Sequence, residues 1–345
     1  MNVAIIGATG YGGAELIRLL QQHPDVTIQS CHSSSQHGSE TVDSYPHLQA
    51  VAGMELKPIV TEEIARDADL VFTATPSGVS SELVPELIKA GTRVIDLSGD
   101  FRLNDTEQYE AWYNKKAPNA AVLDNAVYGL TEWLDTDLTK AQLVANPGCY
   151  PTAALLGLAP LVKRQLIDPN TIIIDAKTGV SGAGRNATTV THFTEMNDNL
   201  KIYKVHEHQH TPEIEQVLSD WSSHAGAVTF STHLVPMTRG IMTTIYTDAP
   251  EGMTTEKLVA LYKESYKDCY FVRIREQGTY PSTKEVYGSN FCDVSLAYDE
   301  RTNRIMIVSV IDNLVKGAAG QAVQNMNRMF GLDEKTGLAF APVYP

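Results

Sequence analysis

A short apolar run at residues 3–6 leads directly into the glycine-rich segment 7–13, and apolar residues then recur at helical spacing over 14–20. A buried strand, a glycine turn and a helix in this order are typical of the first unit of a dinucleotide-binding α/β domain. The spacing is GxxGxxG, with Thr9 where the commoner GxGxxG pattern has its middle glycine. A tight structural turn is the alternative. We expect nucleotide binding by the segment, through Gly7, Thr9, Gly10, Tyr11, Gly12 and Gly13.

The alternation of strand and helix continues to residue 148. Further strands are predicted at 26–30, 69–75 and 93–97, and a helix over 80–90 ends at Gly91 as its C-cap. The pattern predicts an α/β Rossmann-type nucleotide-binding domain.

The pattern changes after Cys149. Strand candidates rich in β-branched residues follow one another with few helices between them, at 171–176, 227–234, 241–247, 290–298 and 304–311. They predict an α+β second domain with a mixed or antiparallel sheet. A last helix, about 316–330, comes late enough to pack on the first domain.

The end of the second predicted strand bears on the choice of cofactor. An NAD site usually has Asp or Glu there for the ribose hydroxyls, whereas residues 30–36 read Ser-Cys-His-Ser-Ser-Ser-Gln. Hydroxyl groups without a carboxylate favour a 2′-phosphate. We therefore expect NADP, with Ser33 and Ser34 as contacts, although no Arg stands close by.

Residues 146–152, Asn-Pro-Gly-Cys-Tyr-Pro-Thr, precede an apolar helical run, and Pro151 or Thr152 is the expected helix start. A thiol at a helix start faces unpaired N–H groups and the positive end of the helix dipole, which favour the thiolate. Cys149 is thus a candidate nucleophile, and a small buried residue in a turn is the alternative.

Three further segments contain polar residues that could bind a ligand or transfer a proton. The segment 177–185 ends Ser-Gly-Ala-Gly-Arg, which suits an anion or nicotinamide loop or a plain glycine-rich turn. Residues 96–102 leave a strand at its C-terminal end, and Arg102 is expected either to bind a substrate anion or to form a salt bridge.

The third segment holds His206, His208 and His210, before a helix start with Thr211 as N-cap. On a strand the three rings would share one face, so a zinc site is one alternative. We expect no metal, and instead expect His208 or His210 to act as general acid/base, since imidazole titrates near neutrality.

Composition limits the remaining classes. With 27 Lys and Arg against 41 Asp and Glu, the net charge of −14 disfavours binding to nucleic acid or an anionic membrane. The four cysteines are widely spaced, which argues against a disulfide framework and for a reducing cytoplasm. The apolar N-terminus is too short for a signal peptide, and no run is long enough for a membrane span.

Together these motifs resemble the N-acetyl-γ-glutamyl-phosphate reductase family, NADP-dependent enzymes of arginine biosynthesis in the wider group of aspartate-semialdehyde and glyceraldehyde-phosphate dehydrogenases. The match covers nearly the whole chain: GATGYGGAEL at 7–16, DLSGDFRL at 96–103, NPGCYPTAA at 146–154, SGAGR at 181–185, HQHTPEIEQ at 208–216 and DNLVKGAAGQAVQ at 312–324. The glycine motif is shared broadly, whereas the cysteine, SGAGR and histidine motifs in this order are far more specific.

The resemblance implies Cys149 as nucleophile and His208 as acid/base. It implies substrate binding by Arg102, Arg185, His210 and Glu213, and further cofactor contacts by Ser181, Gly182 and Asn313. It also implies a discontinuous nucleotide domain, 1–148 with 313–345, around a catalytic and oligomerisation domain at 149–312, and a homodimer or homotetramer.

The expected reaction reduces an acyl phosphate to an aldehyde through a cysteine thioester, with His208 as imidazolium protonating the alkoxide. The nearest rival is an aspartate-semialdehyde dehydrogenase, which the HxHxPEI segment fits less well. Two other classes are alternatives. A non-catalytic protein that senses NADP would not require the cysteine at a helix start or the histidine pair. A cysteine hydrolase would not require the N-terminal glycine turn.

Overall fold

The computed structural model describes all 345 residues, which divide into two compact units. The first unit contains residues 1–148 and 318–339, and the second contains 149–317 and 340–345. The expected domains differ from these units at two places: residues 313–317 and the last six residues belong to the second unit. The chain therefore crosses between the units at 148–149, directly before Cys149.

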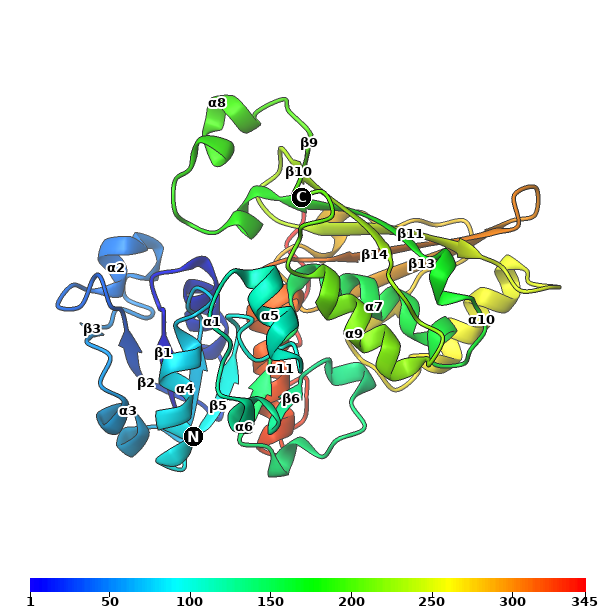
Figure 1. Ribbon diagram of the computed structural model, residues 1–345. Helices are drawn as coiled ribbons and strands as arrows, with labels where there is room; N and C mark the ends of the chain where they lie inside the picture. Colours follow the sequence, from blue (N-terminus) through cyan, green and yellow to red (C-terminus); the bar gives the residue numbers. More distant parts are fainter. The chain divides into compact units, whose positions relative to one another are not determined.

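The first unit is built on a seven-stranded sheet in which every pair of neighbours is parallel, in the order β3-β2-β1-β4-β5-β7-β6 (Figure 1). Its strands are β1 (Asn2–Ile6), β2 (Thr27–His32), β3 (Leu56–Lys57), β4 (Leu70–Thr73), β5 (Arg93–Asp96), β6 (Ala126–Tyr128) and β7 (Leu143–Ala145). The order reverses between β1 and β4, the switch point where such sheets bind ligands. The predicted Rossmann-type fold is confirmed.

Helices surround this sheet: α1 (Tyr11–Leu20), α2 (Thr41–Ser44), α3 (Thr61–Asp67), α4 (Ser80–Lys89), α5 (Thr106–Tyr113), α6 (Ala120–Leu123) and α11 (Gly320–Met329). Short 3₁₀ turns occur at Pro46–Leu48, Thr131–Trp133 and Leu138–Lys140. The last helix, α11, contacts α1 and β5 within this unit (Figure 1). A buried hydrogen bond of 2.9 Å between His23 and Asn327 ties the two distant parts of the sequence together.

The second unit contains a mixed seven-stranded sheet, in the order β12-β13-β14-β11-β8-β10-β9. The pairs β8–β10 and β12–β13 are parallel and the others antiparallel, so the predicted mixed sheet is confirmed. The strands are β8 (Ile173–Gly179), β9 (Lys201–Tyr203), β10 (Thr229–Val235), β11 (Ile241–Asp248), β12 (Val272–Ile274), β13 (Cys292–Asp299) and β14 (Arg304–Ile311).

One face of this sheet is covered by helix α7 (Cys149–Val162), which contacts β11 and β14. Every residue of α7 after Cys149 is buried, as in a helix enclosed on all sides. Pro160 lacks the N–H that would bond to the carbonyl of Leu156, and the hydroxyl of Tyr266 donates to that carbonyl instead. Three other helices complete the unit: α8 (Phe193–Met196), α9 (Thr211–Trp221) and α10 (Thr255–Ser265). Its 3₁₀ turns lie at Pro169–Thr171, Val180–Ala183, Thr189–Thr191 and Thr283–Val286.

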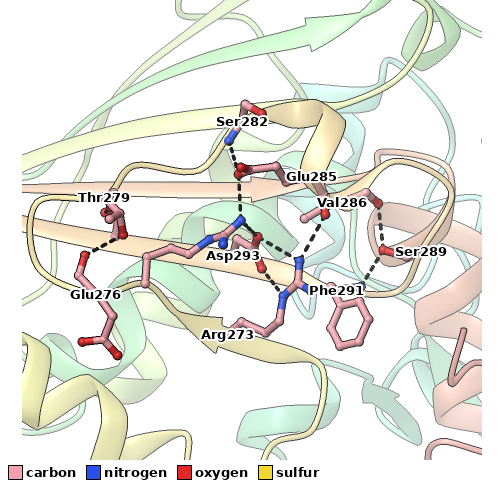
Figure 2. Close-up of polar contacts among 11 residues, drawn as sticks. Arg273, Glu276, Thr279, Ser282, Glu285, Val286, Ser289, Phe291 and Asp293 are labelled. Carbon is pink, nitrogen blue, oxygen red and sulfur yellow. Dashed lines mark hydrogen bonds and ion pairs between the residues drawn. The ribbon is translucent and has the colours of Figure 1, made fainter. Parts of the chain in front are cut away.

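An ion-pair cluster holds the edge of this sheet (Figure 2). Asp293 of β13 is fully buried and binds both Arg273 and Arg275, from β12 and the residue after it. The guanidinium of Arg273 also lies 4.2 Å from the ring centre of Phe291. Glu285 binds Arg275 at 2.7 Å, so the cluster ties the turn Thr283–Val286 to the strands.

Two local predictions are wrong, and the strand that the zinc alternative required is absent. Helix α7 begins at Cys149 itself, not at Pro151 or Thr152. Thr211 is the first residue of α9 and His210 is its N-cap, without a capping side chain. Residues 206–210 form turns rather than a strand, with His206 at φ +59°. In addition, the last helical segment opens with a π-helix at Val315–Ala319.

No helix of the structure combines the length and the apolar character needed to cross a membrane.

Candidate active site

The glycines of the first turn serve two different purposes. Gly7 has φ +87°, and a β-carbon there would lie 2.3 Å from the carbonyl oxygen of Ala74. A β-carbon on Gly13 would lie 2.4 Å from the carbonyl oxygen of Gly7. At Gly10 and Gly12 the nearest atoms would be 3.6 and 3.9 Å away, which is ordinary contact. The fold thus requires glycine at 7 and 13, while the other two keep the surface above the turn open.

The N-terminus of α1 lies at this open surface. Its N-cap is Gly10, and no side chain caps the helix. The first N–H groups of the helix therefore point outward, as in helix N-termini that bind phosphate groups. The hydroxyl of Tyr45 donates to the carbonyl of Thr9 at 2.9 Å and holds the turn from the side. Residues 7–13 fit the pyrophosphate of a dinucleotide.

The end of β2 presents hydroxyl groups and a cation. Ser33 is buried and accepts a hydrogen bond from the N–H of Gln36, whereas Ser34 is exposed. The exposed Lys57 of β3 lies opposite His32 in the parallel strand pair. Burial, and after it the charge of Lys57, lowers the pKa of His32. Lys57 was not predicted, because a two-residue strand 25 positions away in the chain leaves no periodic signal.

Buried carboxylates shape the loops after β4 and β5, and the connection between these two loops was not predicted. Asp100 is fully buried and accepts from the N–H groups of Gly78 and Ser81 and from the hydroxyl of Tyr109. Asp96 accepts from Thr73, and burial followed by the charge of Asp100 raises its pKa. The polar run after β4, Thr75–Ser81, is the signal that could have indicated this loop.

Arg102 braces the segment that leads to Cys149. It is buried, and its guanidinium donates to the carbonyl oxygens of Asn146 at 2.8 Å and Leu97 at 2.9 Å. The side chain of Asn146 is fully buried and donates to the carbonyl of Ala318. These contacts fix the turn that ends the first unit.

In the second unit, Cys149 is the first residue of the buried helix α7. Its side chain is partly exposed, whereas Cys31 and Cys292 are buried. Burial raises the pKa of Cys31 to about 12, so that thiol is inert near neutrality. Cys149 combines access to solvent with N–H groups of the first helical turn, the setting of a reactive cysteine.

His208 lies in a buried aromatic cluster beside this cysteine's helix. Its ring centre is 5.4 Å from that of Tyr150, the residue after Cys149, and 5.6 Å from that of Tyr203. Nδ1 of His208 accepts from the N–H of His210, and Nε2 lies 3.5 Å from the hydroxyl of Tyr203. Burial is the main cause of the raised pKa of Tyr150 and of Tyr203, the latter to about 12, and the nearby Cys149 adds to both shifts.

Burial, followed by the charge of Lys204, lowers the pKa of His208 to about 3. In the protein without substrate the ring of His208 is therefore neutral, and the imidazolium expected for the reaction step stays a prediction. Because Nδ1 accepts a hydrogen bond, the proton of the neutral ring lies on Nε2. Tyr150 and Tyr203 were not predicted as members of this cluster, since nothing in their spacing marks them.

The other expected substrate residues occupy distinct positions. His210 is buried, with its ring centre 4.8 Å from that of His208, and Glu213 is fully buried in the first turn of α9. Arg185 and His206 are exposed. The structure contains no group of three His, Cys, Asp or Glu side chains that could hold a metal ion, so the zinc alternative has no support.

Asn313 links two segments of the expected nicotinamide region. It is buried, accepts from the N–H of Gly240 at 2.8 Å and donates to the hydroxyl of Ser181 at 2.9 Å. A β-carbon on the exposed Gly182 would lie 3.8 Å from the amide nitrogen of Asn313. Asn313 thus positions the loop at 180–183 as well as presenting its own amide.

Two family models match the chain. Residues 2–141 match the NAD binding domain of semialdehyde dehydrogenases, and residues 149–313 match their dimerisation domain. The first unit is therefore of a kind that binds a nicotinamide cofactor.

Proteins of high similarity share one name. A protein from Geobacillus sp. (strain WCH70) is 60% identical over 345 residues, which is all of both chains, and is named N-acetyl-gamma-glutamyl-phosphate reductase. A protein of the same name from Bacillus subtilis (strain 168) is 57% identical, again over all of both chains.

Solved structures share the fold at much lower identity. Aspartate semialdehyde dehydrogenase II from Vibrio cholerae, complexed with ASA, gives a TM-score of 0.71 at 17% identity and covers 95% of this chain and 97% of its own. Aspartate semialdehyde dehydrogenase with NADP from Candida albicans gives 0.66 at 16% identity, with 96% and 98% covered.

Proposed function

The chain belongs to the N-acetyl-γ-glutamyl-phosphate reductases of the semialdehyde dehydrogenase family, and we propose that it reduces N-acetyl-γ-glutamyl phosphate to N-acetylglutamate 5-semialdehyde and phosphate in arginine biosynthesis. The observation that carries the choice of substrate is the identity of 57–60% over the full length to proteins of that name. The placement of Cys149 carries the chemistry.

The thiolate of Cys149 attacks the acyl-phosphate carbon, the carbon–oxygen bond to phosphate breaks, and a thioester forms. The N–H groups in the first turn of α7 stabilise the tetrahedral oxyanion. NADPH, when bound, supplies the hydride that converts the thioester to a thiohemiacetal. Collapse of the resulting thiohemiacetal anion breaks the carbon–sulfur bond, releases the aldehyde and restores the Cys149 thiolate.

His208 serves this sequence from its neutral form. Its Nε2–H donates to the oxygen that becomes an alkoxide, and the negative charge developing there raises the proton affinity of the site. A neutral imidazole with a fixed tautomer stabilises such an oxygen without a buried positive charge in the resting protein. The observation in support is the hydrogen bond to Nδ1 from the N–H of His210.

We assign NADP rather than NAD as the cofactor. The support lies at the end of β2, where Ser33, Ser34 and the neighbouring Lys57 provide hydroxyls and a cation and residues 30–36 provide no carboxylate. The open surface at Gly10 and Gly12 fits the pyrophosphate. Ser181, Gly182 and Asn313 are proposed to contact the nicotinamide half.

The substrate is an anion, and we assign its binding to Arg185, His210, Glu213 and Arg102. Glu213 lies in the first turn of α9, three residues after His210 at the N-cap, and we assign it the orientation of His210. The match to a dimerisation domain supports a homodimer or homotetramer. The four free cysteines suit the reducing cytoplasm.

The reverse reaction tests substrate and cofactor together. Purified protein is incubated with NADP, phosphate and either N-acetylglutamate semialdehyde or aspartate semialdehyde, and NADPH formation is followed by absorbance. The proposal predicts phosphate-dependent turnover with the acetylated substrate at least about 100-fold above the other. A preference for aspartate semialdehyde would instead favour an aspartate-semialdehyde dehydrogenase. No turnover with either substrate would contradict the proposed reaction and favour a protein that binds NADP without catalysis.

A further inference from the structure

A glycine of the π-helix Val315–Ala319 lies directly against the proposed nucleophile. A β-carbon on Gly317 would stand 2.8 Å from Cβ and 3.2 Å from Cα of Cys149, and 3.3 Å from Cδ1 of Ile311. The first of these distances is shorter than real Cβ contacts, and the atoms it meets belong to the start of a buried helix. Only glycine leaves Cys149 where it is.

The position of Gly317 is set by Asp312, the residue directly after β14. The N–H of Gly317 donates to the carbonyl of Asp312, five residues back, which is the hydrogen bond of a π-helix. The carboxylate of Asp312 is fully buried and accepts from the N–H groups of Leu314 at 2.8 Å and Val315 at 3.1 Å. One side chain thus holds the residue before the π-helix and the first residue of the π-helix.

The second oxygen of the same carboxylate is held by a separate loop. It accepts from the N–H of Gly288 at 2.7 Å and lies 3.6 Å from Arg239. The loop is fixed in turn by the cluster of Figure 2, in which Arg273 donates to the carbonyl of Glu285 as well as to Asp293. Asp312 is therefore fixed from both sides.

We infer that Gly317 and Asp312 are positioning residues that set the place and the reactivity of the Cys149 thiol through the π-helix. The inference rests on the proposed role of Cys149 as nucleophile. A π-turn has poorer hydrogen-bond geometry than an α-helical turn, and such turns occur often at functional sites. Here the turn brings a residue without a side chain to the base of the nucleophile.

The test is Gly317→Ala, with Gly157→Ala as the matched control. Gly157 lies on the same helix as Cys149, and a β-carbon there would meet Cδ1 of Ile245 at 3.1 Å, away from the thiol. Both variants add one methyl group to the core of the second unit. Four quantities are measured for each variant. Three are kcat, KM and the dissociation constant of NADPH by fluorescence. The fourth is the rate of Cys149 alkylation as a function of pH: the folded protein reacts with iodoacetamide, and the modified Cys149 peptide is quantified after digestion.

For Gly317→Ala we expect kcat to fall by about 20-fold or more, because small displacements of reacting groups are costly, with KM and NADPH binding within about threefold. The pH at which the rate of Cys149 alkylation is half-maximal should shift by about half a pH unit or more. Gly157→Ala should keep kcat within about threefold and the parent alkylation profile, even where it lowers Tm as much. A folded Gly317→Ala protein with parent kcat and parent profile would overturn the inference.

If Gly317→Ala does not fold, Asp312→Asn decides. It keeps the size of the side chain but replaces one acceptor by a donor, so either Gly288 or the π-helix loses its partner. We expect the same shift in alkylation and a fall in kcat of about threefold to tenfold; parent values for both would overturn the inference. Absence of phosphate-dependent turnover in the parent would count against the proposed function alone, since the alkylation profiles still compare the positioning of the thiol.

Discussion

Nδ1 of His208 accepts a hydrogen bond of 3.1 Å from the backbone N–H of His210. The bond fixes the tautomer of His208 without using the imidazole of His210. The two rings, 4.8 Å apart between centres, therefore have separable roles. A side-chain substitution at 210 keeps the N–H that orients His208.

Replacing each histidine by asparagine separates these roles. His208→Asn removes the proposed donor, so kcat should fall by about 100-fold or more. His210→Asn should mainly raise KM for the semialdehyde and lower kcat by less than about tenfold, since the tautomer of His208 is kept. Steady-state kinetics in the phosphate-dependent direction measure both. Full activity in His208→Asn with loss in His210→Asn would move the acid/base role to His210.

The burial of neutral His208 makes the protein sensitive to acid. Its pKa is about 3 in the folded protein and near the ordinary 6.5 in the unfolded chain. Below pH 6.5 only the unfolded chain takes up this proton, so the free energy of unfolding falls as the pH falls towards 3, and above 6.5 the group contributes nothing.

Between pH 7 and pH 5 the parent should therefore lose about 2 kcal/mol more than His208→Gln, which has no such group. Urea unfolding at the two pH values gives the comparison, and titration of the other histidines is common to both proteins. Equal losses in parent and variant would show that His208 titrates normally.

The two kinds of glycine in the first turn should respond differently to alanine. Gly7→Ala and Gly13→Ala place a β-carbon within 2.4 Å of backbone oxygen, and we expect losses of stability above about 2 kcal/mol. Gly12→Ala should leave Tm unchanged or raised, because alanine is the better helix former by about 1 kcal/mol. It should nevertheless weaken NADPH binding by about tenfold. Fluorescence titration and thermal unfolding give both readouts, and unchanged binding in Gly12→Ala would place the pyrophosphate elsewhere.

A carboxylate at the end of β2 should move the cofactor preference towards NAD. Ser34 is exposed, and Ser34→Asp introduces repulsion of the 2′-phosphate and a partner for free ribose hydroxyls. We expect kcat/KM for NADP to fall by at least about tenfold while that for NAD rises. Gln22→Glu, which adds the same charge beyond the far end of α1, should change neither. Parallel behaviour of the two variants would contradict the assigned phosphate site.

The local predictions from the sequence succeed where the periodicity is strong. The strands near β1, β4 and β5, helix α4 and the strands β11 and β14 lie close to their expected ranges, because alternating or continuous apolar runs reflect their burial. Strands of two or three residues, such as β3 and β12, were missed, since so few residues show no period.

The site depends on contacts that no local pattern encodes. Asn313 bonds to Gly240 and Ser181, which lie 73 and 132 positions away in the chain. The neutral state of His208 follows from its burial among Tyr150, Tyr203 and Phe230. These three residues are far apart in the sequence and come together only in the folded chain. Residue types and order indicated the chemistry, while protonation and orientation required the tertiary structure.

The central claim is that Cys149 carries the acyl group as a thioester. The protein is mixed with NADP and N-acetylglutamate semialdehyde in the absence of phosphate and quenched in acid, and the burst of NADPH and the mass of the Cys149 peptide are measured. We predict about one NADPH for each subunit and an acyl group on Cys149, with neither in Cys149→Ser. Turnover of Cys149→Ser within about tenfold of the parent, or a burst that leaves Cys149 unmodified, would contradict the account.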